Sequence, residues 1–342
     1  MSDLSRRSFL AAAGLAPVGV PSFHVPPRRR AQEPVAVSSL NGRGSVEIAV
    51  EKMAGGLPPV DAAVWGIEPV ENDPRDDSVG FGGLPNEDGV VELDACCQDG
   101  ITGLAGAVAS LRNIKNPAQV ALKVLRHTDH VLLVGEGALR FARAHGFKEE
   151  DLLTESSRKK WLAWKNGLSS TDDWLDDQEN ALTPATKPVR KTGTIHVGCV
   201  NAAGDCGGAT STSGLAFKIP GRVGDSPLIG CGNCVDNDVG VAGSTGRGEA
   251  VILVNGAHTV IEAMRQGQSP TDACLTALRR IVAMTKVPRL LNANGRPDFQ
   301  VNFYAANKKG EVGGAAMYPS RYARHIGHGA EVADAAALFS ER

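Results

Sequence analysis

The chain has 342 residues, of which 42% are hydrophobic and 22% charged, and its formal net charge at pH 7 is -2. This composition is that of a globular protein with a large buried core, and it argues against a disordered or fibrous chain. The balanced charge, without a basic stripe interleaved with aromatic residues, also argues against nucleic acid as a partner.

The N-terminal segment, residues 1–31, differs from the rest of the chain. The run Ser5-Arg6-Arg7-Ser8-Phe9-Leu10 precedes a small apolar stretch at 11–20, a pattern typical of a twin-arginine export signal. A spanning helix needs about 20 apolar residues, so we expect no stable membrane anchor, although an anchor is the alternative. The signal predicts a periplasmic or extracellular protein, cleaved somewhere between Val20 and Gln32.

The next part of the chain predicts mainly helices, with turn-rich stretches between them. Glycine follows two of the predicted helices, and Asn116-Pro117 predicts an N-cap residue followed by a proline at the first position of another helix. The expected elements are a strand at 35–39, helices at 47–54 and 60–70, a strand at 90–93, and helices from 117, at 138–145 and at 151–164.

Residues 167–193 change in character, because Ser, Thr, Asp, Glu, Lys and Pro dominate and the apolar periodicity disappears. We predict a flexible linker here, longer than compact domains usually carry without a functional reason. The expected elements after it are a β-hairpin at 194–212, a strand at 239–244, helices at 257–264 and 270–284, and strands at 299–305 and 310–317. Alternating groups of helices and strands favour a layered fold, of either a general α+β or an αββα architecture.

Seven cysteines are an odd number, and a chain of this length needs no disulfide scaffold, although one or two bridges are possible outside the cytoplasm. Cys231 and Cys234 have the spacing of half a zinc site or of a redox pair. No second pair lies near them, so we predict a glycine-rich loop without a metal.

Three features after the linker could carry chemistry. The first is Gly193-Thr194, where the flexible segment meets a strand. Cleavage between these residues would leave Thr194 with a free α-amine, which has an unperturbed pKa of about 8 and can act as a base for the hydroxyl of the same residue. The other interpretation is an ordinary threonine at a loop-strand junction.

The second feature is the glycine-rich run that contains Arg222 and Asp225. A guanidinium can hold a carboxylate and a carboxylate can hold an ammonium, so the pair suits the α groups of a free amino acid, unless it is an ordinary surface pair. The third is Gly243-Ser244-Thr245-Gly246, where a strand end before a helix could form an oxyanion hole or a phosphate site. A P-loop lysine is missing. Hydroxyls at 210–212 could orient Thr194 or could simply favour a strand.

Together these residues resemble the glycosylasparaginases, a family of N-terminal nucleophile hydrolases. The motifs that carry the resemblance keep their order and spacing from about residue 35 to the C-terminus. They are Asp77-Ser78-Val79-Gly80-Phe81-Gly82-Gly83, Leu93-Asp94-Ala95, Gln98-Asp99-Gly100, the segment 130–136, Thr194-Ile195, Thr210-Ser211-Thr212-Ser213-Gly214, the segment 218–227, Asp236-Asn237 and Thr245-Gly246.

The resemblance implies a four-layer αββα sandwich, a single domain made of two autocleaved chains. The α subunit would span 32–193 and the β subunit 194–342, assembled as a heterotetramer of two α and two β chains. It implies hydrolysis of the amide between N-acetylglucosamine and asparagine, without a metal or organic cofactor. The implied roles are nucleophile for Thr194, its hydroxyl neighbour for Thr212, α-carboxylate clamp for Arg222, α-amine partner for Asp225, and oxyanion hole for Thr245 with Gly246.

Three positions depart from the family pattern. Gly193 stands where the family usually has Asp, Leu40 where a tryptophan lines the substrate pocket, and His196 where glycine is usual. His196 should either crowd the site or point away on the other face of the strand. Two alternatives therefore stay open: an isoaspartyl peptidase or L-asparaginase, and a catalytically inactive secreted protein that binds an amino acid.

Overall fold

The computed structural model describes residues 33–167 and 192–342, which belong to one compact unit. The predicted signal at 1–31 and most of the predicted linker at 167–193 lie outside the described residues. The described part contains both helices and strands in alternating groups, so the predicted α+β class is confirmed. Within this part, no helix combines the length and the apolar character that a membrane span requires.

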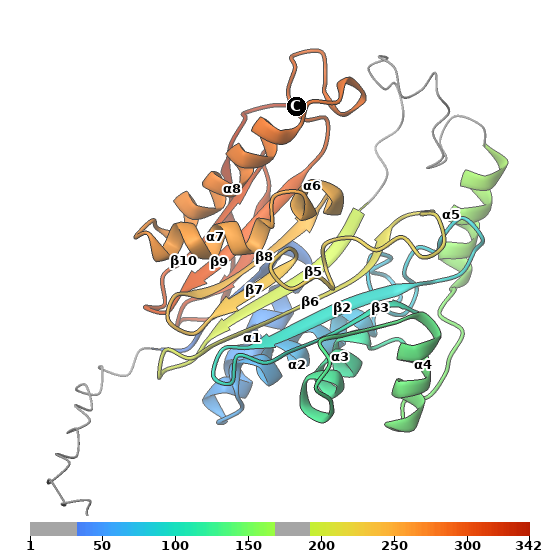
Figure 1. The fold of residues 1–342 in the computed structure, drawn as a ribbon, viewed down its shortest axis with the longest axis horizontal. Coiled ribbons are helices and arrows are strands. Elements are labelled where there is room, and N and C mark those ends of the chain that lie inside the picture. Colours follow the sequence, from blue (N-terminus) through green and yellow to red (C-terminus); the bar gives the residue numbers. More distant parts are fainter. Residues whose placement is uncertain (1–32, 168–191) are drawn as a thin grey trace, which may run out of the picture. The chain divides into compact units, whose positions relative to one another are not determined.

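Two β-sheets form the centre of the described chain (Figure 1). The larger has the strand order β12-β11-β1-β5-β6-β2-β3-β4 and the smaller has the order β13-β10-β9-β8-β7. The strands of the larger sheet are β1 (Val35–Ser39), β2 (Leu93–Asp99), β3 (Ala105–Leu111), β4 (Leu132–Val134), β5 (Thr192–Val200), β6 (Cys206–Leu215), β11 (Arg321–His325) and β12 (Ala330–Asp334). Those of the smaller sheet are β7 (Asn233–Asp236), β8 (Gly240–Gly246), β9 (Val301–Asn307), β10 (Val312–Ala316) and β13 (Ala336–Ala337).

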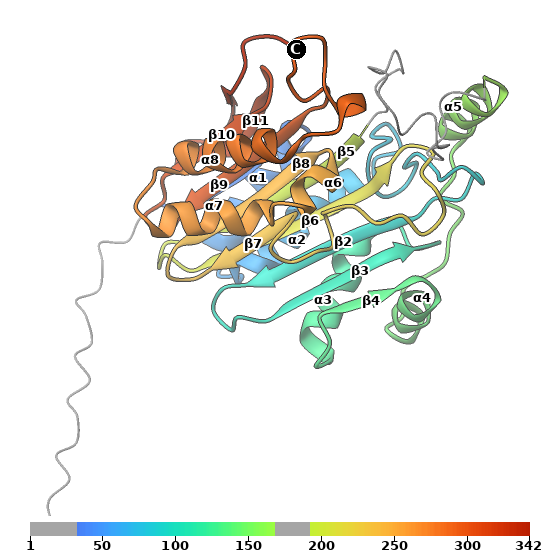
Figure 2. The same ribbon diagram turned by 45° about the horizontal axis from the view of Figure 1, so that its top comes forward.

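Helices cover the outer face of each sheet, as both ribbon views show (Figures 1 and 2). On the larger sheet lie α1 (Arg43–Ala54), α2 (Pro59–Glu71), α3 (Pro117–His127) and α4 (Gly135–Ala144). On the smaller sheet lie α7 (Gly256–Arg265) and α8 (Pro270–Met284). The remaining helices are α5 (Glu155–Asn166), α6 (Gly248–Ile252) and the short 3-10 helices η1 (Leu40–Gly42) and η2 (Pro288–Leu290).

The faces of β5 explain where its side chains point. Ile195 and Val197 belong to the apolar cluster shared with helices α1 to α3, whereas Val200 belongs to the cluster between the two sheets. Because successive side chains of a strand alternate between faces, Thr194 and His196 share the face that is turned toward the smaller sheet. The strand therefore brings the predicted nucleophile between the two sheets.

Most predicted elements are present, with shifted ends. The β-hairpin is confirmed, since β5 and β6 pair antiparallel along their length. The strand predicted at 90–93 is wrong, because β2 begins only at Leu93. The residues before it turn toward other partners: Asn86 accepts a hydrogen bond from the backbone of Val90 at 3.0 Å, and the carbonyl of Glu92 accepts one from Lys218 at 3.0 Å.

The predicted cap of α3 is also wrong in its detail. The helix does begin at Pro117, but the side chain of Asn116 makes no capping hydrogen bond. It donates instead to Asn72 at 3.1 Å, while Glu71 accepts from the backbone N–H of Ala118 at 3.1 Å. A carboxylate from the end of α2 thus satisfies the donor that a local cap would have satisfied.

Candidate active site

A β-bulge lies beside the predicted cleavage site. Gly193 pairs with Gly214 and Thr194 pairs with Thr212, so Ser213 is an extra residue on β6. The backbone N–H and the hydroxyl of Ser213 both donate to the carbonyl of Ser78, at 2.8 and 2.9 Å. The bulge therefore ties the hairpin to the loop that contains Ser78.

The hydroxyls of Thr194 and Thr212 meet at this bulge. Thr194 is buried, and its Oγ1 donates to Oγ1 of Thr212 at 3.2 Å. Thr212 Oγ1 donates in turn to the carbonyl oxygen of Gly193 at 2.5 Å and accepts from the backbone N–H of Gly214 at 2.8 Å. The Thr212 hydroxyl therefore contacts both Thr194, the predicted nucleophile, and the Gly193 carbonyl that Thr194 would attack.

Gly193 has a steric reason to be glycine in this chain. A Cβ atom at this position would lie 1.8 Å from Cβ and 2.6 Å from Oγ of Ser78. Ser78 Oγ also donates to the carboxylate of Asp76. We assigned no role to Ser78 from the sequence, because a contact between residues 78 and 193 leaves no signal in local spacing.

The Arg222 guanidinium lines a small pocket that also contains Thr194 and Thr212, and Glu249 holds it in place. Its Nε and Nη2 donate to Oε1 of Glu249 at 2.9 and 2.8 Å. Its Nη1 lies near two glycines, 3.3 Å from the position that a Cβ of Gly214 would take and 3.0 Å from that of Gly224. Glu249 thus fixes one edge of the guanidinium and leaves the Nη1 end turned toward the pocket.

The Asp225 carboxylate is buried beside Arg222 and accepts a hydrogen bond from Oγ of Ser244 at 2.6 Å. Burial raises the pKa of Asp225 to about 6, against the opposing effects of the Ser244 hydrogen bond and the Arg222 charge. Its Oδ1 faces Gly248, where a Cβ would lie 2.8 Å away. A ligand ammonium would therefore meet a buried carboxyl group that is ionised above about pH 6.

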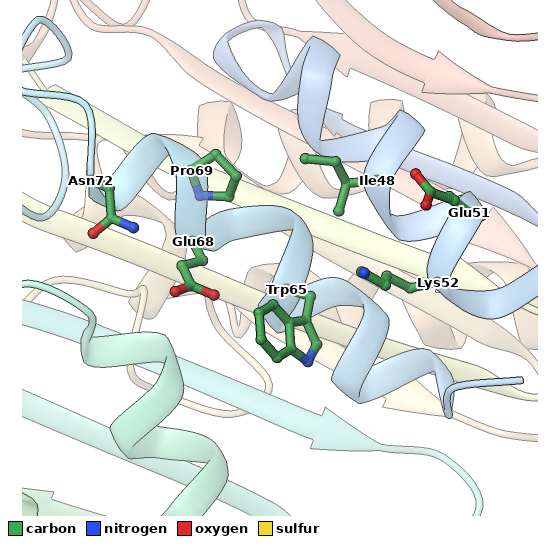
Figure 3. Close-up of a pocket in the computed structure, with 7 residues that line it drawn as sticks. All are labelled: Ile48, Glu51, Lys52, Trp65, Glu68, Pro69 and Asn72. Carbon is green, nitrogen blue, oxygen red and sulfur yellow. The ribbon is translucent and has the colours of Figure 1, made fainter. Parts of the chain in front are cut away.

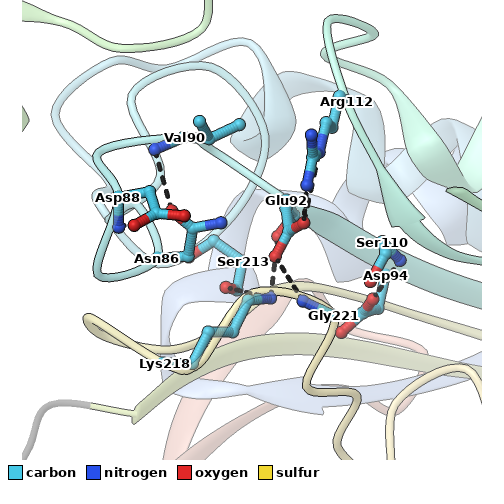
Figure 4. A network of polar contacts seen from close by, with 10 residues as sticks. All are labelled: Asn86, Asp88, Val90, Glu92, Asp94, Ser110, Arg112, Ser213, Lys218 and Gly221. Carbon is cyan, nitrogen blue, oxygen red and sulfur yellow. Dashed lines mark hydrogen bonds and ion pairs between the residues drawn. The ribbon is translucent and has the colours of Figure 1, made fainter. Parts of the chain in front are cut away.

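A buried polar network supports the loop that carries Arg222 and Asp225 (Figure 4). Glu92 accepts hydrogen bonds from Arg112 at 2.6 Å and from the backbone N–H of Gly221 at 3.1 Å. Lys218 is fully buried and donates to the carbonyls of Glu92 at 3.0 Å and Ser213 at 3.2 Å. Lys218 and Gly221, at the two ends of the loop's first turn, are thus bonded to Glu92, which precedes β2, and Lys218 also to Ser213 at the bulge.

The charges of this network stabilise one another. Burial opposes ionisation of Glu92, but the hydrogen bonds from Arg112 and Gly221 outweigh it and hold the pKa of Glu92 below its ordinary value. Burial lowers the pKa of Lys218 despite the nearby carboxylates of Asp94 and Glu92, and it raises that of Asp94. Balanced internal charges of this kind are costly to leave unpaired.

Thr245 and Gly246 end strand β8 on the opposite wall. Thr245 Oγ1 lies 2.8 Å from the Tyr304 hydroxyl and accepts from Nδ2 of Asn302 at 3.1 Å. Burial raises the pKa of Tyr304, so its hydroxyl stays protonated. Gly246 has a φ of 112°, and a Cβ there would lie 2.3 Å from the carbonyl of Gln300, so both conformation and space require glycine.

A small pocket brings most of the predicted site residues together. Thr245 does not line the pocket, although its neighbour Gly246 does. Leu40 does not line it either, because this residue stands at the start of η1 and is 43% exposed. The residues that line the pocket are Thr194, Thr212, Gly214, Leu215, Arg222, Gly224, Asp225, Ser226 and Gly246.

A second, more open hollow lies on the outer surface of α1 and α2 (Figure 3). None of its lining residues is a predicted site residue, and Lys52 lies over the ring of Trp65, with Nζ 5.7 Å from the ring centroid. The residues of this hollow are Ile48, Glu51, Lys52, Trp65, Glu68, Pro69 and Asn72.

Both expectations for His196 are wrong. The side chain shares the face of Thr194, as residues two apart in a strand must, yet it does not line the pocket. It is fully buried between the sheets.

All seven cysteines lie in the described residues, are buried and form no disulfide. The described chain also contains no group of three or more His, Cys, Asp or Glu side chains arranged to hold a metal ion.

Comparison with known proteins places this site in a family. A family model described as asparaginase matches residues 28–291. The N(4)-(beta-N-acetylglucosaminyl)-L-asparaginase of Elizabethkingia miricola is 42% identical over 82% of this chain and 78% of its own length. The enzymes of the same name from Mus musculus and Rattus norvegicus are each 36% identical over 72% of this chain and 77% of their own. We conclude that the chain belongs to this asparaginase family and, within it, to the glycosylasparaginases, as the motifs in its sequence predicted.

Proposed function

We propose that this chain is the precursor of an amidohydrolase that cleaves its own Gly193–Thr194 bond and then hydrolyses the side-chain amide of glycosylated asparagine. The names of its relatives support the substrate. The observation that carries the mechanism is the Thr212 hydroxyl, which contacts both Thr194 Oγ1 and the Gly193 carbonyl.

In the self-cleavage step, Thr194 Oγ1 attacks the Gly193 carbonyl carbon. Negative charge develops on the carbonyl oxygen, where the hydrogen bond from Thr212 stabilises it. Collapse breaks the C–N bond, so that an ester joins Gly193 to Thr194 Oγ1 and the proton lost by the hydroxyl is balanced by one gained at nitrogen. Water then hydrolyses the ester and leaves Thr194 with a free α-amine.

In the hydrolytic reaction, Arg222 binds the α-carboxylate of the asparagine and Asp225 binds its α-amine. These contacts place the side-chain amide against Thr194 Oγ1, with the α-amine of Thr194 as the base. Thr194 forms a β-aspartyl ester as the glycosylamine leaves, and water hydrolyses the ester to aspartate.

Thr245 and Gly246 supply the oxyanion hole in this proposal. The Thr245 hydroxyl oxygen can accept two hydrogen bonds, from Asn302 and from the Tyr304 hydroxyl. When both are made, its own proton is available for the oxyanion beside the backbone N–H of Gly246. Such preorganised donors commonly account for about 10²-fold or more in rate.

The layers described above support the four-layer αββα architecture of N-terminal nucleophile hydrolases. We further propose that the mature protein assembles from two α and two β chains, and that the twin-arginine signal exports it to the periplasm or beyond the cell. No metal or organic cofactor enters the mechanism.

A release assay on the purified protein tests the substrate. It compares N-acetylglucosaminyl-asparagine, a β-aspartyl dipeptide and free asparagine under identical conditions. We expect the glycosylated amide to have the highest kcat/KM, and blocking its α-amine or α-carboxylate to abolish turnover. Preference for the dipeptide or for asparagine would favour an isoaspartyl peptidase or L-asparaginase, and binding without release would favour an inactive binding protein.

A further inference from the structure

The imidazole of His196 lies directly on the backbone of β8. A Cβ atom added to Gly243 would lie 2.1 Å from Nδ1 and 2.2 Å from Cε1 of this ring. These distances are far below those that real Cβ atoms show, so the ring occupies the space of a side chain at 243. The histidine on β5 and the glycine on β8 are therefore complementary in size.

The same ring contacts the wall that carries the proposed oxyanion hole. It stacks on Tyr304, with ring centroids 6.3 Å apart and an interplanar angle of 11°. Tyr304 pairs with Gly243 across the strands, and its hydroxyl lies 2.8 Å from Thr245 Oγ1. The imidazole thus rests on a pair of residues, one of which bonds directly to Thr245.

A chain of hydrogen bonds also connects the ring to the Asp225 side of the pocket. Thr210 Oγ1 lies 3.1 Å from Nδ1 of His196 and donates to the carbonyl of Gly232 at 3.2 Å. The same carbonyl accepts from the backbone N–H of Ser244 at 3.1 Å, and Ser244 Oγ donates to Asp225 at 2.6 Å. The ring is therefore bonded into the structure that holds both β8 and Asp225.

This network favours one tautomer of the imidazole. When Thr210 gives its one hydroxyl proton to Gly232, Nδ1 of His196 carries the hydrogen of the bond between them. Nε2 then presents a lone pair, and it has no hydrogen-bond partner in the described chain. Burial lowers the pKa of His196 to about 3, against the smaller opposing effect of a backbone hydrogen bond at Ala209, so the ring stays neutral.

We propose that His196 is a positioning residue of the active site: its neutral Nδ1–H imidazole sets the separation between the strand of Thr194 and the strand of Thr245 and Gly246. This inference rests on the proposed function. Gly243 completes the device, because it provides the space that the ring fills. The arrangement also explains why this chain tolerates histidine two residues after the nucleophile.

Variants of the two positions test the proposal in the full-length protein. We expect His196→Gly to lower kcat at least about tenfold with a smaller change in KM, because a shift of the oxyanion donors acts on the transition state. Gly243→Ala should be more damaging, since the methyl group would collide with the ring. The double variant His196→Gly/Gly243→Ala should recover kcat relative to either single variant.

A matched cavity on the opposite face of β5 serves as the control. Val197 faces the helices, so Val197→Ala should lower the melting temperature without changing kcat. Unchanged kcat in His196→Gly, or a double variant no better than the single ones, would overturn the positioning role.

Nitrogen NMR of ring-labelled parent protein tests the same idea without any substitution. We expect protonated Nδ1 and bare Nε2 for His196, and the opposite tautomer would contradict the proposed network. A parent protein that neither cleaves itself nor releases product would refute the proposed function instead, while the melting temperatures of the four variants and the tautomer would still show whether His196 and Gly243 are coupled.

Discussion

The hairpin β5–β6 and the loop 218–227 hold the two halves of the proposed chemistry in different ways. In the hairpin, strand pairing sets Thr194 opposite Thr212, and a single bulge at Ser213 adjusts the contact. In the loop, Arg222 and Asp225 are held by side chains from elsewhere, such as Glu249 and Ser244. Backbone register therefore places the proposed nucleophile, whereas buried polar contacts place the proposed substrate clamp.

This difference predicts where substitutions will act. Changes in the hairpin should affect bond-breaking steps, because the hydroxyls there contact the groups that react in the proposed mechanism. Changes around the loop should affect binding of the α groups, since the proposed function assigns Arg222 and Asp225 to those groups and not to the scissile amide. The following variants, from the largest expected effect to the smallest, can break or sharpen this comparison.

Thr212→Val should have the largest effect. It removes the hydroxyl that donates to the Gly193 carbonyl and keeps most of the side-chain shape. Loss of one such donor should slow self-cleavage by about 10²-fold or more, measured as the fraction of cut chain on denaturing gels over time. Ser211→Ala is the matched control, since its hydroxyl faces the other way and donates to Glu71 at 2.6 Å. It should lower stability, and equal cleavage rates in the two variants would refute the hairpin's role.

Arg222→Gln should act on binding. A charge-assisted hydrogen bond contributes about 1.5–3 kcal/mol, so we expect KM for the glycosylated amide to rise roughly 10- to 150-fold. Arg222→Lys keeps the charge without the planar fork and should lie between the parent and Arg222→Gln. An asparagine analogue whose α-carboxylate is blocked should bind the parent and Arg222→Gln with the same weak affinity. A kcat effect as large as the KM effect would contradict the assigned role.

The pH dependence of ligand binding should report on Asp225. Its pKa is raised to about 6 in the free site, so it is ionised above that pH and protonated below it. Affinity for an α-ammonium should thus fall as pH decreases below about 6, approaching tenfold per pH unit. Calorimetry with L-aspartate on the matured enzyme measures this fall. L-Malate, which has a hydroxyl in place of the amine, should not show it, and parallel curves for the two ligands would contradict the pairing.

Glu249→Gln should have the smallest effect and the opposite sign. The amide oxygen can still orient Arg222, but the negative charge that competes with the substrate carboxylate is gone. Because the Glu249 side chain is 43% exposed, we expect KM to fall only about 2- to 5-fold. Glu249→Ala removes the orientation as well and should raise KM. Identical kinetics for both variants would show that the contact has no role in the clamp.

The contrast between hairpin and loop also explains how much could be predicted from sequence. Alternation and turn residues are local signals, so they predicted the hairpin. The family motifs included five residues that line the pocket, Thr194, Thr212, Arg222, Asp225 and Gly246, together with Thr245, which does not line it. The supports could not be predicted, since their partners are distant in the chain: Lys218 and Glu92 are 126 residues apart and Thr245 and Tyr304 are 59 apart.

His196 shows the same limit. Its position two residues after Thr194 determines its face, but its surroundings depend on the space above Gly243, a residue of the other sheet. The same applies to Gly193, which is explained by contact with Ser78. Sequence reasoning can identify such departures, and only the packed structure shows which neighbour compensates for each.

Mass spectrometry of the purified parent protein and of Thr194→Ala tests the central claim most directly. The account predicts two fragments from the parent, one of which begins at Thr194, and a single uncut chain from the variant. An uncut parent after long incubation, a fragment that begins at another residue, or cleavage at this bond in Thr194→Ala would contradict it.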